Sequence, residues 1–250
     1  MAGSLRWIGH ATVRIDLDGV RLLTDPLLRN RIAHLRRSGR VDAAAGDEVD
    51  VVLLSHGHLD HLDVPSLRRF AAVPVLVPRG LGPLLRRKGL EAVTEVDEGD
   101  ELRFGEVTVR AVEANHEGGR PPFPSSDVRA LGFVVEGSSR VYFAGDTDLF
   151  DAMDGLVPEL DVALLPIWGW GPSLGRGAHM DPDRAAEAAR LLRPRIVVPI
   201  HWGTYFPLHL GLRGAPAFVM APAARFVRAV SEAAPDVEVR VLAPGDEMPF

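Results

Sequence analysis

The stretch Val49-Asp50-Val51-Val52-Leu53-Leu54-Ser55-His56-Gly57-His58-Leu59-Asp60-His61 decides the fold, because a mostly apolar run leads directly into three histidines and an aspartate. The run predicts a buried strand. Imidazole and carboxylate side chains gathered where a strand ends are typical of a site for zinc, iron, nickel or copper. In an extended loop His56 and His58 point the same way and can reach one ion. Asp60 and His61 follow the turn at Gly57 and can reach a second ion.

Three further metal-binding side chains occupy the same kind of position, each following an apolar run. They are His116 after Val107 to Val112, Asp146 after Val141 to Ala144, and His201 after Ile196 to Ile200. Taken alone, each histidine is more often a core or surface residue, and the aspartate more often belongs to a turn. Their order and their shared placement at strand ends favour a joint role in binding metal.

The pattern H-x-H-x-D-H after an apolar strand, followed by Asn115-His116, Gly145-Asp146-Thr147 and His201, resembles the metallo-β-lactamase-fold hydrolases over essentially the whole chain. The resemblance implies one domain over residues 1–250 with an α/β fold, a four-layer αββα sandwich whose site lies at one edge between the sheets. It also implies that His56, His58 and His116 hold one metal ion, that Asp60, His61 and His201 hold another, and that Asp146 bridges them.

Three shorter motifs narrow the resemblance to a branch. Trp7-Ile8-Gly9-His10-Ala11-Thr12, His179-Met180-Asp181-Pro182 and His201-Trp202-Gly203-Thr204 resemble the branch that holds ascorbate-6-phosphate lactonase and the N-acyl-phosphatidylethanolamine-hydrolysing phospholipase D. His179 is then a candidate to bind substrate or to protonate the leaving group, with packing or capping as the alternative. His10 either supports the metal ligands from behind or is structural. Asp25 is expected to orient the ligand loop through hydrogen bonds, or else to form an Asx-turn before Pro26.

Arginines supply the remaining candidates. Arg129 follows a Pro-rich loop and could bind a phosphate or carboxylate of the substrate through a bidentate fork, or it is a solvated surface residue. The segment Leu27 to Asp47 is expected to be a long loop or short helix. Its arginines are expected to form a solvated helix face, with steering of an anionic substrate or contact with lipid head groups as the alternative: Arg29, Arg31, Arg36, Arg37 and Arg40.

The donor set indicates a binuclear metal-dependent hydrolase. Two divalent ions about 3.5–4 Å apart need a carboxylate between them, and they make a bridging hydroxide available near neutral pH. We expect zinc, with manganese or iron as alternatives, and attack on a phosphodiester or lactone/ester bond of a small anionic or lipid-like substrate. Asp60, Asp146 and His179 are the expected catalytic residues. An iron-dependent dioxygenase or other oxidoreductase on the same scaffold, or a non-enzymatic metal-binding protein, is the alternative.

Composition narrows the remaining classes of protein. The 250 residues include no cysteine, which excludes disulfides, iron–sulfur clusters and thiol nucleophiles. A formal net charge of −6 argues against a nucleic-acid partner. No apolar run is long enough to predict a signal peptide or a membrane span, so we expect a cytoplasmic protein. A homo-oligomer is an open expectation, because Trp168 and Trp170 in a glycine-rich loop could serve an interface or a substrate groove. Gly171-Pro172-Ser173-Leu174-Gly175 matches G-x-S-x-G, but the glycines that follow it argue against a nucleophile elbow.

Overall fold

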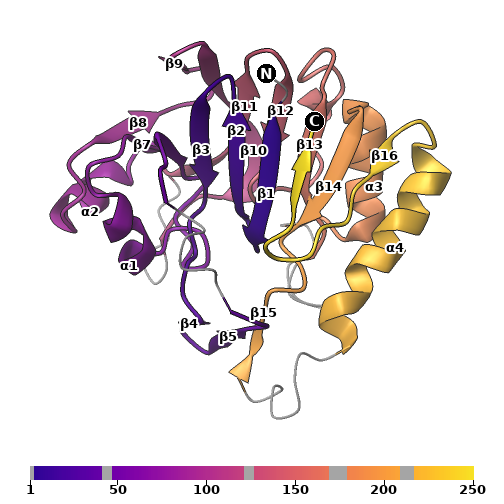
Figure 1. The fold of residues 1–250 in the computed structure, drawn as a ribbon, viewed down its shortest axis with the longest axis horizontal. Coiled ribbons are helices and arrows are strands. Elements are labelled where there is room, and N and C mark those ends of the chain that lie inside the picture. Colours follow the sequence, from indigo (N-terminus) through magenta and orange to yellow (C-terminus); the bar gives the residue numbers. More distant parts are fainter. Residues whose placement is uncertain (1–2, 41–46, 121–126, 169–178, 209–216) are drawn as a thin grey trace.

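Two seven-stranded sheets form the centre of the structure, a computed structural model that describes residues 3–40, 47–120, 127–168, 179–208 and 217–250 (Figure 1). The first sheet has the order β17 (Glu247–Pro249), β1 (Ser4–Gly9), β2 (Thr12–Leu17), β3 (Val20–Thr24), β6 (Val51–Leu53), β7 (Val75–Pro78) and β8 (Val93–Val96). The second has the order β16 (Glu238–Val239), β14 (Ile196–Ile200), β13 (Val162–Pro166), β12 (Arg140–Phe143), β11 (Arg129–Glu136), β10 (Val107–Glu117) and β9 (Glu101–Phe104). A third, three-stranded sheet has the order β15 (Tyr205–Pro207), β5 (Leu35–Arg37) and β4 (Arg31–Ile32).

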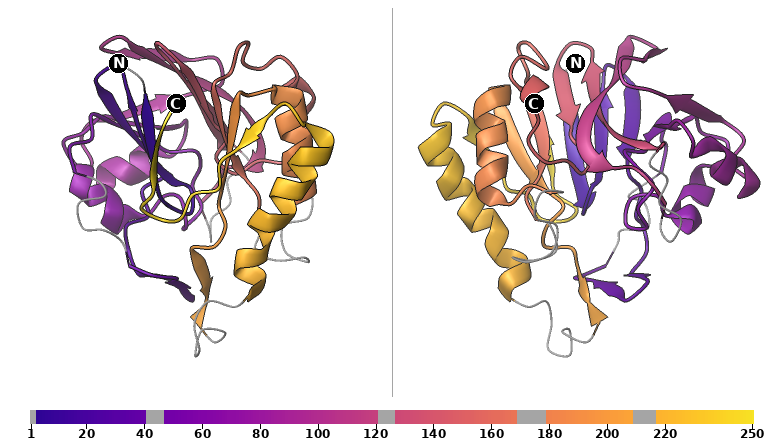
Figure 2. Two further views of the ribbon diagram at one scale, coloured as in Figure 1. Left: turned by 45° about the vertical axis from the view of Figure 1, so that its right-hand side comes forward. Right: turned by 180° about the vertical axis from the view of Figure 1, so that it is seen from behind.

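Helices cover the outer faces of the two large sheets (Figures 1 and 2). The first sheet carries α1 (Val64–Leu67), the 3₁₀ turn η1 (Arg68–Phe70) and α2 (Gly82–Arg87). The second carries the 3₁₀ turn η2 (Asp151–Met153), α3 (Pro182–Leu192) and α4 (Ala217–Ala233). One apolar cluster lies between the sheets and reaches beneath α3 and α4, and a second lies beneath α1 and α2. The predicted four-layer αββα sandwich is confirmed.

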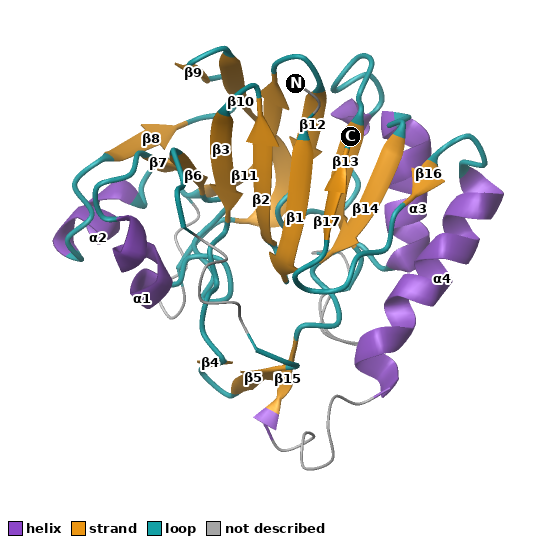
Figure 3. Ribbon diagram, viewed as in Figure 1, coloured by secondary structure: helices purple, strands orange, loops and turns teal. Residues whose placement is uncertain are grey.

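Burial along the strands follows from this layering. Strands β6, β13 and β14 are buried at every position, because each pairs in parallel with a neighbour and is covered on both faces. Strand β2 alternates between buried and half-buried positions, as an antiparallel strand nearer the edge does. The carboxyl ends of parallel strands meet at one edge of a sheet. The loops after β6, β12 and β14 therefore bring their polar residues to the edge that faces the three-stranded sheet (Figure 3).

Strands β1 and β2 form an antiparallel pair, because Gly9 and His10 turn the chain at positive φ between them. The structure corrects the prediction for Leu27 to Asp47, which contains β4 and β5 where we expected a loop or short helix. Helix α4 begins at Ala217 and includes Pro222. Within the described ranges, none of the helices has the length and apolar character of a membrane span.

Candidate metal centre

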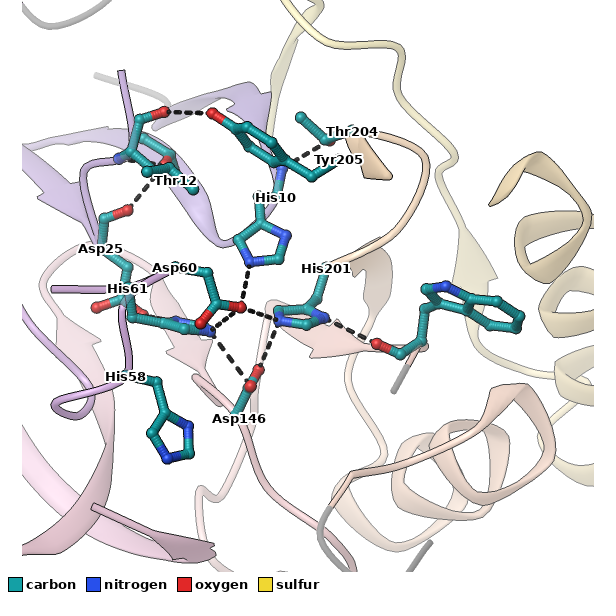
Figure 4. Close-up of polar contacts among 12 residues, drawn as sticks. His10, Thr12, Asp25, His58, Asp60, His61, Asp146, His201, Thr204 and Tyr205 are labelled. Carbon is teal, nitrogen blue, oxygen red and sulfur yellow. Dashed lines mark hydrogen bonds and ion pairs between the residues drawn. The ribbon is translucent and has the colours of Figure 1, made fainter. Parts of the chain in front are cut away.

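The seven predicted donors converge at the shared edge of the two large sheets. Figure 4 shows His58, Asp60, His61, Asp146 and His201 among them. The loop after β6 carries His56, His58, Asp60 and His61, and its start is fixed because the backbone N–H of Leu131 donates to the carbonyl of Ser55 (2.9 Å). The other three come from the opposite sheet: His116 from the end of β10, Asp146 from the turn after β12, and His201 from the turn after β14.

The first donor group consists of His56, His58 and His116, whose ligand atoms all lie within 4.8 Å of one another. His56 is fully buried, and its Nδ1 lies 2.9 Å from the Ser55 hydroxyl. His58 and His116 are half-buried, with 3.2 Å between His58 Nδ1 and His116 Nε2. Three imidazoles gathered in this way suit a borderline divalent cation such as zinc.

The second donor group consists of Asp60, His61 and His201, and the structure adds His10 to it within the same 4.8 Å limit. Asp60 Oδ2 lies 3.7 Å from His61 Nε2 and 3.6 Å from His201 Nε2. The Nδ1–H of His201 donates to the carbonyl of Trp168 (2.8 Å). In the neutral ring this bond leaves the lone pair on Nε2, the atom that faces the carboxylates.

Asp146 lies between the two groups. Its Oδ2 is 3.2 Å from His61 Nε2 and 4.0 Å from His56 Nε2, and its Oδ1 is 3.3 Å from His201 Nε2. A carboxylate that faces imidazoles of both groups has the position that a bridging ligand needs.

Asp25 lies behind the donor loop and hydrogen-bonds to it. The carboxylate is fully buried and accepts from the Ser55 N–H (2.8 Å), the Ser55 hydroxyl (2.5 Å) and the His61 Nδ1–H (2.7 Å). Because both oxygens are occupied, we assign Asp25 to orienting His61, although it also lies within ligand distance of His56 and His61.

Electrostatics and unsatisfied atoms test whether these residues fit a cation. Among the described residues, no hydrogen-bond partner is found for the buried Nε2 atoms of His56 and His61 or for Asp146 Oδ1. Burial alone would raise the pKa of Asp146, but the nearby His201, His61 and His179 outweigh it and hold the pKa well below its usual value. Burial likewise opposes protonation of His61, but Asp146, Asp60 and Asp25 raise its pKa well above 6.5. An environment that favours an extra positive charge, with donor atoms left unsatisfied, fits a divalent metal ion.

His179 and Arg129 lie in different surroundings. His179 is half-buried, with its Nε2 3.0 Å from Asp146 Oδ2, so it adjoins the donor groups. Arg129 is exposed and lines a cavity of about 290 Å³ together with Arg79 and Asp97, outside the donor groups. Trp168 is half-buried and packs against the core rather than standing exposed, whereas Trp170 and Gly171 to Gly175 lie outside the described residues.

The family profile described as the beta-lactamase superfamily domain matches residues 20–202, which include all seven predicted donors, from His56 to His201. The chain belongs to the metallo-β-lactamase superfamily. It falls among the superfamily's metal-dependent hydrolases: a protein of Rubrobacter xylanophilus with that name is 34% identical, over 99% of this chain and 98% of its own length.

A curated protein and a solved structure are also similar to this chain. The N-acyl-phosphatidylethanolamine-hydrolyzing phospholipase D 1 of Caenorhabditis elegans is 31% identical over 80% of this chain, which spans 63% of the nematode protein's length. The solved structure of Igni18, a metallo hydrolase from the archaeon Ignicoccus hospitalis, superposes with a TM-score of 0.76 at 25% identity. That superposition covers 100% of this chain and 99% of the archaeal one.

The sequence did not reveal several residues that hold the donor loop and its surroundings in place. Arg120 is half-buried, and its Nη1 donates to the carbonyls of Gly57 (3.3 Å) and Leu62, so it ties both ends of the donor loop to the segment after β10. Arg37 was expected on a solvated helix face, but it lies buried in strand β5, where its guanidinium donates to the carbonyl of Ile8. Arg29 forms a bidentate pair with Asp63, at 2.9 and 2.6 Å. Neither interaction has a local signal, since each joins residues 29 or 34 positions apart.

Proposed function

We propose that this protein is a binuclear metal-dependent hydrolase that cleaves a phosphodiester or a lactone/ester bond of a small anionic or lipid-like substrate. One observation carries the proposal: two donor groups, each with donors from both large sheets, face one another across the carboxylate of Asp146. His56, His58 and His116 would hold one ion, and Asp60, His61 and His201 the other. Nitrogen and carboxylate donors without thiolate suit zinc, and they also accept manganese or iron.

The ions, when bound, would lower the pKa of a water and polarise the bond under attack. The chain's residues divide the remaining work. Asp60 and Asp146 keep negative charge at the centre, because the surrounding histidines hold the pKa of each carboxyl well below its usual value despite burial. The chain has no cysteine, and the Ser55 hydroxyl beside His56 is fully buried and donates to Asp25, so neither kind of side chain is free to act as a nucleophile, which is consistent with direct attack by water.

His179 is the proposed acid or substrate ligand. Burial opposes its protonation, but the carboxylate of Asp146 outweighs burial and raises the pKa of His179 above 6.5. A ring whose protonated form is favoured in this way, and which is half-open to solvent, can bind an anionic oxygen or donate a proton to a leaving group. Arg129 would contact the substrate where an anionic part of it reaches the cavity beside β11.

The substrate class rests on the branch. The nematode relative is named for hydrolysis of a phospholipid, which is a phosphodiester. Leu59 is 40% exposed beside Asp60 and would offer an apolar contact to a lipid-like group. The cytoplasmic location and the homo-oligomer stay predictions from the sequence.

The test is hydrolysis of a bis-aryl phosphodiester beside a panel of lactones, with protein reconstituted with zinc or manganese and Asp146→Ala as the control. We expect diester turnover that is lost in the variant. Lactone opening alone would transfer the proposal to the lactonase side of the branch. Two bound metals with no turnover of either class would overturn the substrate proposal, and one bound iron with oxygen consumption would favour the redox alternative.

A further inference from the structure

The backbone of His10 has an unusual conformation that hydrogen bonds hold in place. It adopts φ +57°, a left-handed conformation that is uncommon for a residue other than glycine. Its N–H donates to the Thr204 hydroxyl (2.8 Å), and its carbonyl accepts from the Trp7 indole (2.9 Å) and from the backbone N–H of His201 (3.0 Å). Strained backbone of this kind persists where the surroundings over-determine it, and it is often found at functional sites.

A second left-handed histidine faces it. His201 has φ +60°, and its ring centroid lies 3.9 Å from that of His10. One histidine follows β1 of the first sheet and the other follows β14 of the second, so the two turns interlock across the sandwich through reciprocal hydrogen bonds. Trp7 and Trp202 stack behind them, with 5.4 Å between ring centroids.

The turn at Gly9 and His10 also packs against the side chain of Arg37. A Cβ on Gly9 would lie 2.5 Å from Arg37 Nη2 and 2.9 Å from Thr204 Cγ2, and Gly9 itself has φ +129°. Only glycine fits there. The buried guanidinium of Arg37 thus closes the turn that aims His10.

The His10 side chain is aimed at a metal-binding carboxylate. The ring is 2% exposed, and its Nε2 lies 3.1 Å from Asp60 Oδ2 (Figure 4). A carboxylate is an acceptor, so the ring donates Nε2–H. The same Oδ2 atom faces His61 and His201, at 3.7 and 3.6 Å. His10 therefore touches Asp60 of the second donor group and is absent from the groups that contain His56, His58 or His116.

We propose that His10 is a positioning residue that holds Asp60 for the metal ion of the second donor group and thereby controls occupancy of that position alone. The inference rests on the proposed binuclear centre. Outer partners that orient a metal ligand typically change metal affinity about 10–100-fold when they are removed. The first position, which His10 does not contact, should keep its affinity.

The test compares His10→Leu, which keeps bulk but removes the donor, with His10→Gln, which keeps an N–H donor. His34→Gln is the matched control, because His34 is exposed on the β4–β5 turn. Zinc stoichiometry and chelator competition are measured on each metal-depleted and reloaded protein, with circular dichroism to check folding. We expect His10→Leu to bind the second zinc about 10–100-fold more weakly, His10→Gln to recover part of that loss, and His34→Gln to match the wild type.

Unchanged affinity of the second zinc in a folded His10→Leu protein would overturn the inference, as would equal losses in the Leu and Gln variants. A wild type that binds a single zinc would overturn the binuclear centre and the inference with it. Nitrogen-15 NMR of the zinc-loaded wild type decides the matter even where the variants do not fold. We expect His10 as the neutral Nε2–H tautomer, and coordination of zinc by His10 Nε2 would instead make it a ligand and refute the positioning role.

Discussion

The two donor groups differ in how firmly the fold holds them. In the first group, His58 and His116 are half-buried and contact one another. In the second, every predicted donor has a partner behind it: Asp25 behind His61, the Trp168 carbonyl behind His201, and His10 behind Asp60. In the proposed binuclear centre we therefore expect the second position to be held more firmly than the first, two of whose three donors are half-buried.

Asp146→Ala is expected to have the largest effect, because this carboxylate faces both donor groups and its loss should impair both. We expect kcat/KM for the phosphodiester to fall more than about 100-fold, since loss of even an outer partner of a metal ligand costs about 10–100-fold. Metal content and turnover are measured on the same preparation. Asp154→Ala is the matched control, because Asp154 is an exposed partner of Arg193. Near-normal turnover by a metal-loaded Asp146→Ala protein would refute the bridging role.

Asp25→Asn sharpens the comparison by loosening His61 without removing a proposed ligand. An amide has one acceptor oxygen in place of two, so its NH2 group must face either the Ser55 N–H or the donors from Ser55 Oγ and His61 Nδ1, and at least one buried donor loses its partner. We expect about 1–3 kcal/mol lower stability of the metal-depleted protein and about 10–100-fold weaker metal binding. Urea unfolding and chelator competition measure the two effects. If both stay at wild-type values, the buried hydrogen bonds of Asp25 do not hold the donor loop.

Sequence patterns predicted the donors better than their supports, for a physical reason. Each predicted donor follows a strand of apolar residues or ends one. The ends of parallel strands meet at one edge of a sheet, which places Asp146 beside His201, and the family resemblance implied that His56 of the other sheet joins them. The contact between His10 and Asp60 joins residues 50 positions apart and depends on a left-handed turn that no hydrophobic period reveals.

The small sheet escaped prediction for a different reason. Strand β4 has two residues and β5 has three, too few to show the alternation that identifies a strand. A run with several arginines then suggested a solvated face. The burial of Arg37 follows instead from its hydrogen bond to the Ile8 carbonyl of β1 and from Tyr205, over whose ring the guanidinium lies at 5.6 Å.

Arg120→Met tests whether the donor loop needs its outer tie. The variant keeps an apolar stem but loses the donors to the carbonyls of Gly57 and Leu62, which bracket the loop. We expect about 1–3 kcal/mol lower stability and weaker metal binding at both positions, because the loop supplies donors to each. Differential scanning calorimetry with and without zinc measures the first effect, and chelator competition the second. Arg103→Met, which removes an exposed partner of Glu106, should leave both unchanged.

Asp50→Asn is expected to have the smallest effect on stability and metal binding, because this carboxylate lies beside strand β6 but outside both donor groups. Arg21 donates to it from Nε (3.0 Å) and Nη2 (3.1 Å), and these hydrogen bonds lower the pKa of Asp50. The side chain is 40% exposed, so solvent screens the pair, and we expect a loss of about 1 kcal/mol or less.

A carboxyl whose pKa is lower in the folded state stabilises the protein above its unfolded pKa of about 3.9, and this contribution disappears as the pH falls through the folded-state value. Urea unfolding should therefore separate Asp50→Asn from the wild type at pH 7, much less in about 1 M salt, and not at all at a pH below both pKa values. Metal binding should be unchanged at either position. Asp50→Asn could instead weaken zinc binding as much as Asp25→Asn does. In that case the charges along the whole strand, and not the hydrogen bonds behind each donor, would set the difference between the two proposed metal positions.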